Sequence, residues 1–252
     1  MPPNAINKRP SAATQLLDLT LIQLSNFRWA WRSTLLTGIV APLLSLMGLG
    51  LFARDAGAEA LAYVLTGNVV MALMFENLNR VSSNFAYMKA MGTLTYFATL
   101  PVRRSLLVLA TLLAFFLLSL PATLVTILFG SWFLGVTLHV SPFIVVVVPL
   151  TAVPLAALGA FIGLKMRSPA EAGPVTTLIV FLFISIGPVI FPPSRLPSVM
   201  QSIGRLSPAT YAASALRQTL LGPATPQLAI DLAVLLFVAV ILSHLVNRTN
   251  SQ

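Results

Sequence analysis

The sequence predicts an all-α membrane protein with six transmembrane helices. Hydrophobic residues make up 57% of the 252 residues and charged residues only 8%, whereas about a quarter of a soluble domain is charged. The 60 residues between Arg104 and Lys165 contain no charged side chain, a length that accommodates two spans and a turn. In a membrane protein the net charge of +9 reflects basic loops, so we expect no nucleic-acid partner.

Six apolar segments of about 20 residues define the expected spans. They lie at residues 33–52, 60–81, 105–129, 142–164, 175–191 and 227–246. No internal repeat of the kind found in many secondary transporters is visible. We therefore predict one six-span domain at 33–252, preceded by an N-terminal segment at 1–32.

The segment before the first span predicts a moderately amphipathic helix at residues 11–32. Asp18 and Arg28 lie on its polar face. Trp29 and Trp31, beside arginines, are typical of a helix that lies in the headgroup layer. A simple aromatic and basic anchor before the first span explains the same residues.

The distribution of Lys and Arg predicts the orientation, because cytoplasmic loops collect these residues. With the N-terminus inside, eleven fall on the cytoplasmic side: Lys8, Arg9, Arg28, Arg32, Arg80, Lys89, Arg103, Arg104, Lys165, Arg167 and Arg248. Four fall outside: Arg54, Arg195, Arg205 and Arg217. We expect a multi-pass protein of the plasma (bacterial inner) membrane with both termini in the cytoplasm.

An acidic residue occurs near the expected inner end of the second span. Glu76 and Arg80 are four residues apart, a spacing that allows them to pair on one helix face. An acid inside a membrane is a candidate functional residue. At this depth, however, we favour a structural pair or an inner-gate contact over a proton relay.

The loop between the second and third spans carries an apolar stripe. Met88, Met91, Leu94 and Phe97 recur at every third position, and no other part of the chain is expected to cover them. An exposed apolar stripe on a cytoplasmic loop favours a protein partner. Packing against lipid headgroups is the alternative.

Residues 187–222 separate the last two spans and predict two short helices broken by prolines. The first lies near 197–206, and the second begins with Ser207 as N-cap and Pro208 at its first position and closes before Gly222. Helices of 10 to 14 residues are too short for a hydrocarbon core of about 30 Å. The pair should dip into the membrane and return, or lie along its surface.

These two segments resemble those of type-2 ABC exporter permeases, and the resemblance extends over nearly the whole chain. FPPSRLP followed by a short helix and SPATYAASALRQTLLG resembles the family's segment before the last span. Gly92, Thr93 and Leu94, followed by Leu100 and Pro101, resemble the family's loop between spans two and three.

The resemblance implies that this loop is a coupling helix, which seats in a groove of a separate ATP-binding subunit. The implied coupling residues are Met88, Met91, Gly92, Thr93, Leu94, Phe97 and Pro101. Family members often carry an acid just after the Gly-Thr-Leu, where this chain has Thr95. An ion pair with the ATPase is therefore not expected at that position.

The resemblance also implies the rest of the complex: two permease subunits, identical or different, in membrane lipid, with two ATP-binding subunits below them. ATP and Mg would then bind to the partner and not to this chain. On the outer side, the candidate site residues come from the family pattern and from the prolines and glycine of the segment at 187–222. They are Pro192, Arg195, Pro197, Pro208, Tyr211, Arg217 and Gly222.

The chain contains no catalytic motif. Its only lysines are Lys8, Lys89 and Lys165, and none follows a glycine, so it has no P-loop for ATP. His139 and His244 have no Cys or carboxylate near them in sequence and make a poor metal site. We therefore expect a permease subunit that is not itself an enzyme and has no metal site.

The expected cargo is an amphipathic small molecule, a drug or a lipid, since the aromatic residues form no obvious ring of the kind a polysaccharide path would need. A polysaccharide or glycolipid exporter of the same family is the first alternative. An ion-coupled secondary transporter is another, but it would need an acid or histidine near a span centre, where none is expected. A passive membrane anchor is a third, and it would not need the segment at 187–222.

Overall fold

The computed structural model describes residues 11–26, 31–100, 102–223 and 225–250, and no strand occurs in them. Their α-helices are α1 Ala12–Asn26, α2 Trp31–Ala53, α3 Ala58–Met74, α4 Arg80–Ala90, α5 Thr93–Thr99, α6 Arg104–Leu134, α7 Ile144–Lys165, α8 Pro169–Ile186, α9 Ser198–Gly204, α10 Pro208–Leu220 and α11 Pro226–Asn250. Shorter elements are η1 Arg54–Ala56, the π-helix η2 Phe75–Asn79 and η3 Pro193–Arg195.

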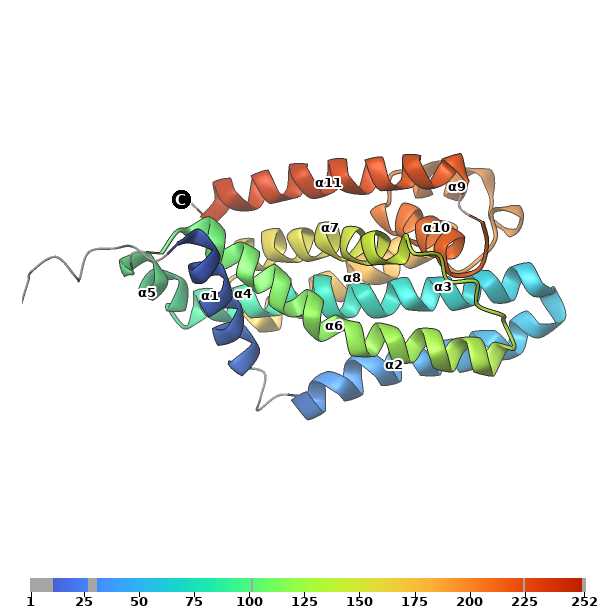
Figure 1. Cartoon of the computed structure of the whole chain (residues 1–252), viewed down its shortest axis with the longest axis horizontal. Helices are drawn as coiled ribbons and strands as arrows, with labels where there is room; N and C mark the ends of the chain where they lie inside the picture. The colour runs from blue at the N-terminus through green and yellow to red at the C-terminus, as the bar shows by residue number, and fades with distance from the viewer. Residues whose placement is uncertain (1–10, 27–30, 101, 224, 251–252) are drawn as a thin grey trace, which may run out of the picture.

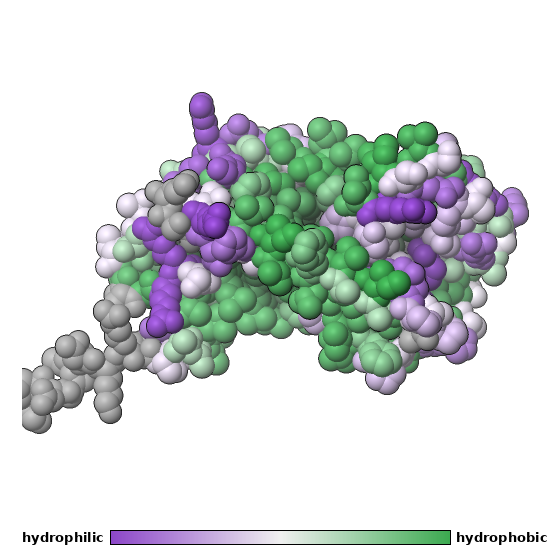
Figure 2. Space-filling model, turned by 90° about the horizontal axis from the view of Figure 1, so that it is seen from above, coloured by the Kyte–Doolittle hydropathy of each residue, from purple (hydrophilic) through white to green (hydrophobic). Residues whose placement is uncertain are grey.

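Six helical segments among the described residues are long and apolar enough to cross a membrane, which confirms the predicted fold class. They are Gly38–Ala56, Ala58–Ala90, Arg104–Leu134, Ile144–Lys165, Pro169–Ile186 and Pro226–Thr249. The long helices run side by side, with α5 at one end of the bundle and α9 and α10 at the other (Figure 1). Apolar side chains form a band between two more polar ends (Figure 2).

The second span is the centre of the bundle and is longer than predicted. Helix α3, the π-turn η2 and α4 form one continuous element of 33 residues. The predicted end at residue 81 followed the drop in hydropathy at Ser82. The helix continues because Val81, Ser82, Phe85 and Ala86 are buried against neighbouring spans.

Two glycines of α7 allow this helix to approach the central one closely. A Cβ on Gly159 would collide with the backbone carbonyl oxygen of Leu78, and one on Gly163 with that of Ser82. Their spacing is the Gly-x-x-x-Gly pattern of close helix pairs in membranes. The sequence carried this signal, but we did not predict the contact from it.

Replacing Gly159 or Gly163 with alanine should destabilise the protein. The colliding atoms are backbone oxygens, so the helices must move apart, and overpacking of this kind costs about 1–3 kcal/mol. Gly48→Ala is the matched control, because a Cβ there meets nothing within 4 Å. Thermal unfolding of the purified protein in detergent measures the effect, and equal stability of all three variants would show that the contact is not tight.

The N-terminal helix packs on the bundle. Helix α1 covers Ala12–Asn26, and residues 27–30, with Arg28 and Trp29, lie outside the described residues. One face of α1 packs on α6: Leu19 is buried, and Gln23 Nε2 donates a hydrogen bond to Thr111 Oγ1 at 3.1 Å. Leu17 and Leu21 are exposed, and α1 crosses the bundle instead of running along it (Figure 1).

Candidate functional site: the two ends of the bundle

The end of the bundle that holds α5, which is predicted to face the cytoplasm, carries a tight turn and a short helix. Helix α4 ends at Ala90, and Gly92 takes a left-handed conformation with φ of 71°, which favours glycine. The chain then enters α5, and Leu100 ends that helix in an extended conformation. Pro101, one of the predicted coupling residues, lies outside the described residues.

The apolar stripe predicted on this loop is largely covered by the chain itself, which corrects the expectation that nothing would bury it. Met88 is 5% exposed, and Leu94 and Phe97 pack in the same cluster as Leu19 of α1 and Leu107 of α6. The spacing was correct for one helix face, but the sequence did not reveal that α1 and α6 lie against it.

A different apolar surface is left open at this end. Tyr87, Met91 and Tyr96 are 53%, 64% and 63% exposed, and they come from α4, the turn and α5. Of the four residues in the predicted stripe, Met91 lies on this exposed surface. We call Tyr87, Met91 and Tyr96 the inner apolar surface.

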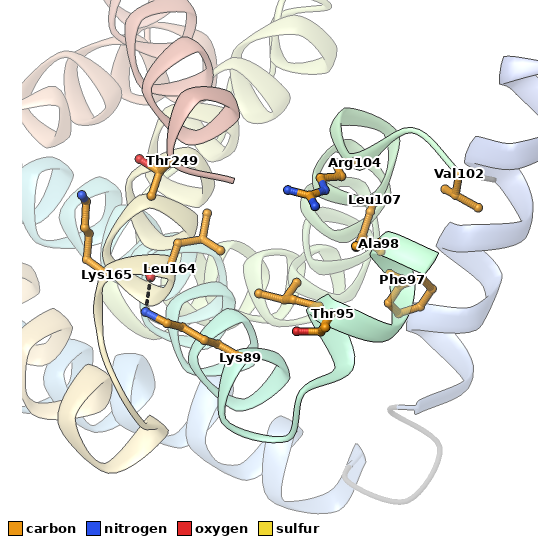
Figure 3. A pocket seen from close by; sticks show the side chains of 11 residues that line it. Lys89, Thr95, Phe97, Ala98, Val102, Arg104, Leu107, Leu164, Lys165 and Thr249 are labelled. Carbon is orange, nitrogen blue, oxygen red and sulfur yellow. Dashed lines mark hydrogen bonds between the residues drawn. The ribbon is translucent and has the colours of Figure 1, made fainter. Parts of the chain in front are cut away.

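A pocket of about 420 Å³ lies beside α5 (Figure 3). Lys89 of α4, Arg104 of α6 and Lys165 of α7 line it, together with apolar side chains such as Leu107. Lys89 Nζ donates a hydrogen bond to the Leu164 carbonyl oxygen at 2.8 Å. That bond places the inner ends of α4 and α7 at the same level.

Glu76 and Arg80 form the predicted pair, with Arg80 Nη1 3.0 Å from Glu76 Oε2. Glu76 precedes Lys89 by 13 residues, or about 20 Å along the helix. The Glu76 side chain is only 2% exposed, because the neighbouring spans enclose it. The pair is therefore buried inside the bundle.

The π-helix η2 coincides with the segment that contains Glu76. A π-turn adds a residue to the helix and changes which side chains face each neighbour. Asn79 Nδ2 donates to Thr177 Oγ1 at 3.1 Å, and Thr176 Oγ1 donates to Asn79 Oδ1 at 3.0 Å. These two bonds hold α8 against the turn.

Other polar residues of the spans mainly satisfy their own backbone, as the sequence favoured. Side chains donate to a carbonyl four residues earlier at Asn68, Thr111, Thr123 and Thr126. Such bonds are typical of membrane helices and form no cluster for a ligand.

At the opposite end, the segment between the last two spans folds as two short helices. Helix α9, Ser198–Gly204, is shorter than the predicted 197–206, whereas α10 has the predicted bounds. Helix α10 starts at Pro208 and ends at Leu220. Ser207 occupies the N-cap position, but its hydroxyl makes no cap hydrogen bond, unlike the prediction. Tyr211 Oη instead donates to the Arg205 carbonyl at 2.7 Å, and Thr210 Oγ1 to that of Gly204 at 2.8 Å. These bonds fix α10 to the end of α9.

The other predicted residues of this segment precede its short helices, contact η1 or follow α10. Pro192 is the residue before η3, and Pro197 precedes α9. Arg195 Nη2 donates to the Ala56 carbonyl at 3.4 Å, which ties the segment to η1. Gly222 follows α10 and has open space around it.

Arg217 has partners that the sequence did not suggest. Its guanidinium carbon lies 3.4 Å from the centre of the Tyr63 ring of α3. Arg217, Tyr63 and Asp231 of α11 line one pocket of about 360 Å³. Asp231 accepts hydrogen bonds from Gln218 and Gln227 at 3.0 Å each. Only the tertiary fold joins these three elements, α3, α10 and α11, since no sequence spacing relates Tyr63 to Arg217.

Most of the chain matches a known protein family. Residues 14–221 match the family model described as ABC-2 type transporter. The match includes α1, the first five spans, α5, α9 and α10. No curated protein matches the chain closely enough to count as a relative.

Proposed function

The chain belongs to the ABC-2 type transporter family, and from that premise we propose that it is the permease subunit of an ATP-driven exporter. It is a multi-pass transmembrane component of an ABC transporter. In our proposal two permease subunits, identical or different, form the path and two separate ATP-binding subunits drive it, with ATP and Mg bound by those partners. The single observation that carries this proposal is the family match over residues 14–221.

We place the ATPase contact at the inner apolar surface and α5. Both lie at the end of the bundle that collects most of the basic loops, which favours the cytoplasm. Tyr87, Met91 and Tyr96 expose large side chains there, and aromatic residues are enriched in protein interfaces. Helix α5 packs on α6 through Leu94 and Phe97, so a push on α5 would pass to the spans as rigid-body motion.

We place the outer gate of the path at α9 and α10. The apolar face of α9 is uncovered, with Val199 66% exposed and Leu206 85% exposed after its end. The pocket beside it combines Tyr63 with Arg217 and Asp231, which suits a cargo with apolar and charged parts. This supports an amphipathic small molecule, drug or lipid as cargo, rather than a polysaccharide.

Co-purification tests the proposal. The full chain, expressed with the ATP-binding subunit encoded beside it, should retain that subunit on an affinity column, and the complex should hydrolyse ATP at a rate different from that of the ATPase alone. A chain that neither binds this subunit nor changes its hydrolysis would contradict the proposal. An affinity tag placed at the N-terminus for this purification must not disturb α1, because α1 packs on α6.

A further inference from the structure

The pocket between α3, α10 and α11 contains a cation whose buried N–H groups have no partner. Arg217 lines this pocket of about 360 Å³, which we call the Arg217 pocket. The Nε and Nη2 atoms of Arg217 are buried and make no hydrogen bond with the described residues. A guanidinium has five N–H donors and no acceptor, and burying a charge without hydrogen bonds is costly. Arg217 therefore needs acceptors that the described part of the chain does not supply.

The tyrosine beside Arg217 determines how these donors can be used. The guanidinium carbon lies 3.4 Å from the centre of the Tyr63 ring, a distance at which the guanidinium stacks on the face of the ring and gains a cation–π interaction. The N–H groups of a guanidinium lie in its plane, so stacking does not use them. Tyr63 thus holds the cation in place and leaves its donors for an acceptor at the edge of the stack.

The carboxylate of the same pocket is engaged elsewhere. Asp231 lines the pocket, but within the described part of the chain neither a hydrogen bond nor an ion pair joins it to Arg217. Asp231 Oδ2 accepts from Gln218 Nε2 and Asp231 Oδ1 from Gln227 Nε2, each at 3.0 Å. Burial lowers the pKa of Arg217, and nearby acidic groups, Asp231 and Glu59 among them, offset this only in part. Asp231 therefore serves as an acceptor that joins α10 to α11.

The other walls of the pocket suit an amphipathic molecule with an anionic end. Arg205 also lines the pocket and is exposed, so two cations face one carboxylate. Pro188 and Ile230 supply apolar surface beside them. A volume of about 360 Å³ is near the lower end for small-molecule sites. The pocket can therefore hold the charged end of a cargo molecule and the first part of its apolar body.

We propose that the Arg217 pocket binds the anionic group, a carboxylate or a phosphate, of an amphipathic molecule. Both groups present two oxygens to one guanidinium, which binds them in a bidentate manner. That this molecule is cargo rests on the exporter function proposed above, whereas its binding does not. A bound anion would contact α10, the helix to which we assign the outer gate.

Binding of four soluble probes to the purified full chain tests the inference. The probes are octyl phosphate, octanoate, octylamine and inorganic phosphate, and the detergent is an uncharged maltoside. Octylamine has the same chain as the first two probes and the opposite charge. Isothermal titration calorimetry measures the affinity, and thermal unfolding without probe measures the stability of each variant.

Two substitutions at Arg217 and one matched control complete the test. Arg217→Gln removes the charge, and Arg217→Lys keeps the charge but cannot bind in a bidentate manner. The control is Arg54→Gln, because the Arg54 guanidinium also lies over an aromatic ring, that of Phe133, but Arg54 does not line the pocket.

We expect the two anionic amphiphiles to bind more tightly than octylamine and inorganic phosphate. The tighter of the two identifies the anionic group as a phosphate or a carboxylate. Arg217→Gln should weaken their binding roughly 30-fold or more, because it removes one partner of a buried charged pair. Arg217→Lys should cause a smaller loss, and Arg54→Gln should bind as the original chain does. High salt should weaken binding only modestly, since the site is partly enclosed.

Four results would overturn the inference. The first is no binding of either anionic amphiphile. The second is equally tight binding of octylamine, which would show a site for an apolar chain, or of inorganic phosphate, which would show a site for a free anion. The third is an equal loss of affinity in Arg54→Gln.

The fourth result is unchanged affinity in Arg217→Gln, with or without lower stability, which would show that Arg217 only holds α10 against α3. If Arg217→Gln does not fold, Arg217→Lys supplies the comparison, and unchanged affinity for both anionic amphiphiles then overturns the inference. Binding is measured without ATP or the ATP-binding subunit, so its failure is separate from failure of the exporter proposal.

Discussion

Replacing Met91 and Tyr96 with aspartate should abolish coupling to the ATP-binding subunit. Both side chains are more than 60% exposed, so within this chain the substitution removes little packing, chiefly the edge-to-face contact of Tyr96 with Phe97. It places two carboxylates in the proposed interface. Loss of a central interface side chain costs about 2 kcal/mol or more, roughly 30-fold in affinity, for each residue. Co-purification of the ATPase and the ATP hydrolysis of the complex give the two readouts.

Two control variants define what the result means. Leu206→Asp replaces a side chain that is 85% exposed at the other end of the bundle and should leave the ATPase bound. Leu94→Asp places a charge in the contact between α5 and α6 and should lower the stability of the permease itself. If the Met91→Asp/Tyr96→Asp variant binds the ATP-binding subunit as tightly as the original chain does, the proposed docking surface is wrong.

The sequence predicted the parts of the fold that depend on hydropathy and on local chain geometry. The six spans follow from apolar length, and the bounds of α10 follow from Pro208 and Gly222, which limit a helix whatever surrounds it. The apolar pattern also showed that Leu94 and Phe97 share one face. What covers that face depends on where α1 and α6 pack, and a single sequence does not contain this information.

The same limit explains why the second span is longer than predicted. Hydropathy placed the end of the second span near residue 81, because Ser82 and Asn84 lower the local average. In the fold, Ser82 lies against Gly163 of α7, so a polar residue is buried by a close helix contact. The Gly-x-x-x-Gly signal of α7 was the available hint that a neighbour would approach there.

Replacing Arg80 with methionine should cause a large loss of stability. Glu76 is 2% exposed and its carboxylate lies 3.0 Å from Arg80. Removing one partner of a buried pair leaves an uncompensated charge, at a cost of about 3–5 kcal/mol. Arg103→Met is the matched control, because Arg103 is exposed and changes at such sites stay within about 0.5 kcal/mol. Unfolding by heat or denaturant in detergent measures both.

The double variant Glu76→Gln/Arg80→Met separates a structural role of the pair from a proton relay. Removing both charges should restore most of the stability, because a neutral pair of similar shape replaces a buried ion pair at little cost. If the pair is structural, the ATP hydrolysis of the reconstituted complex, measured per folded permease, should return with the stability. A double variant as stable as the original chain but without coupled hydrolysis would instead assign Glu76 to the transport mechanism and favour an ion-coupled step. The burial of Glu76, whose side chain is 2% exposed, makes this comparison the one that distinguishes the two roles.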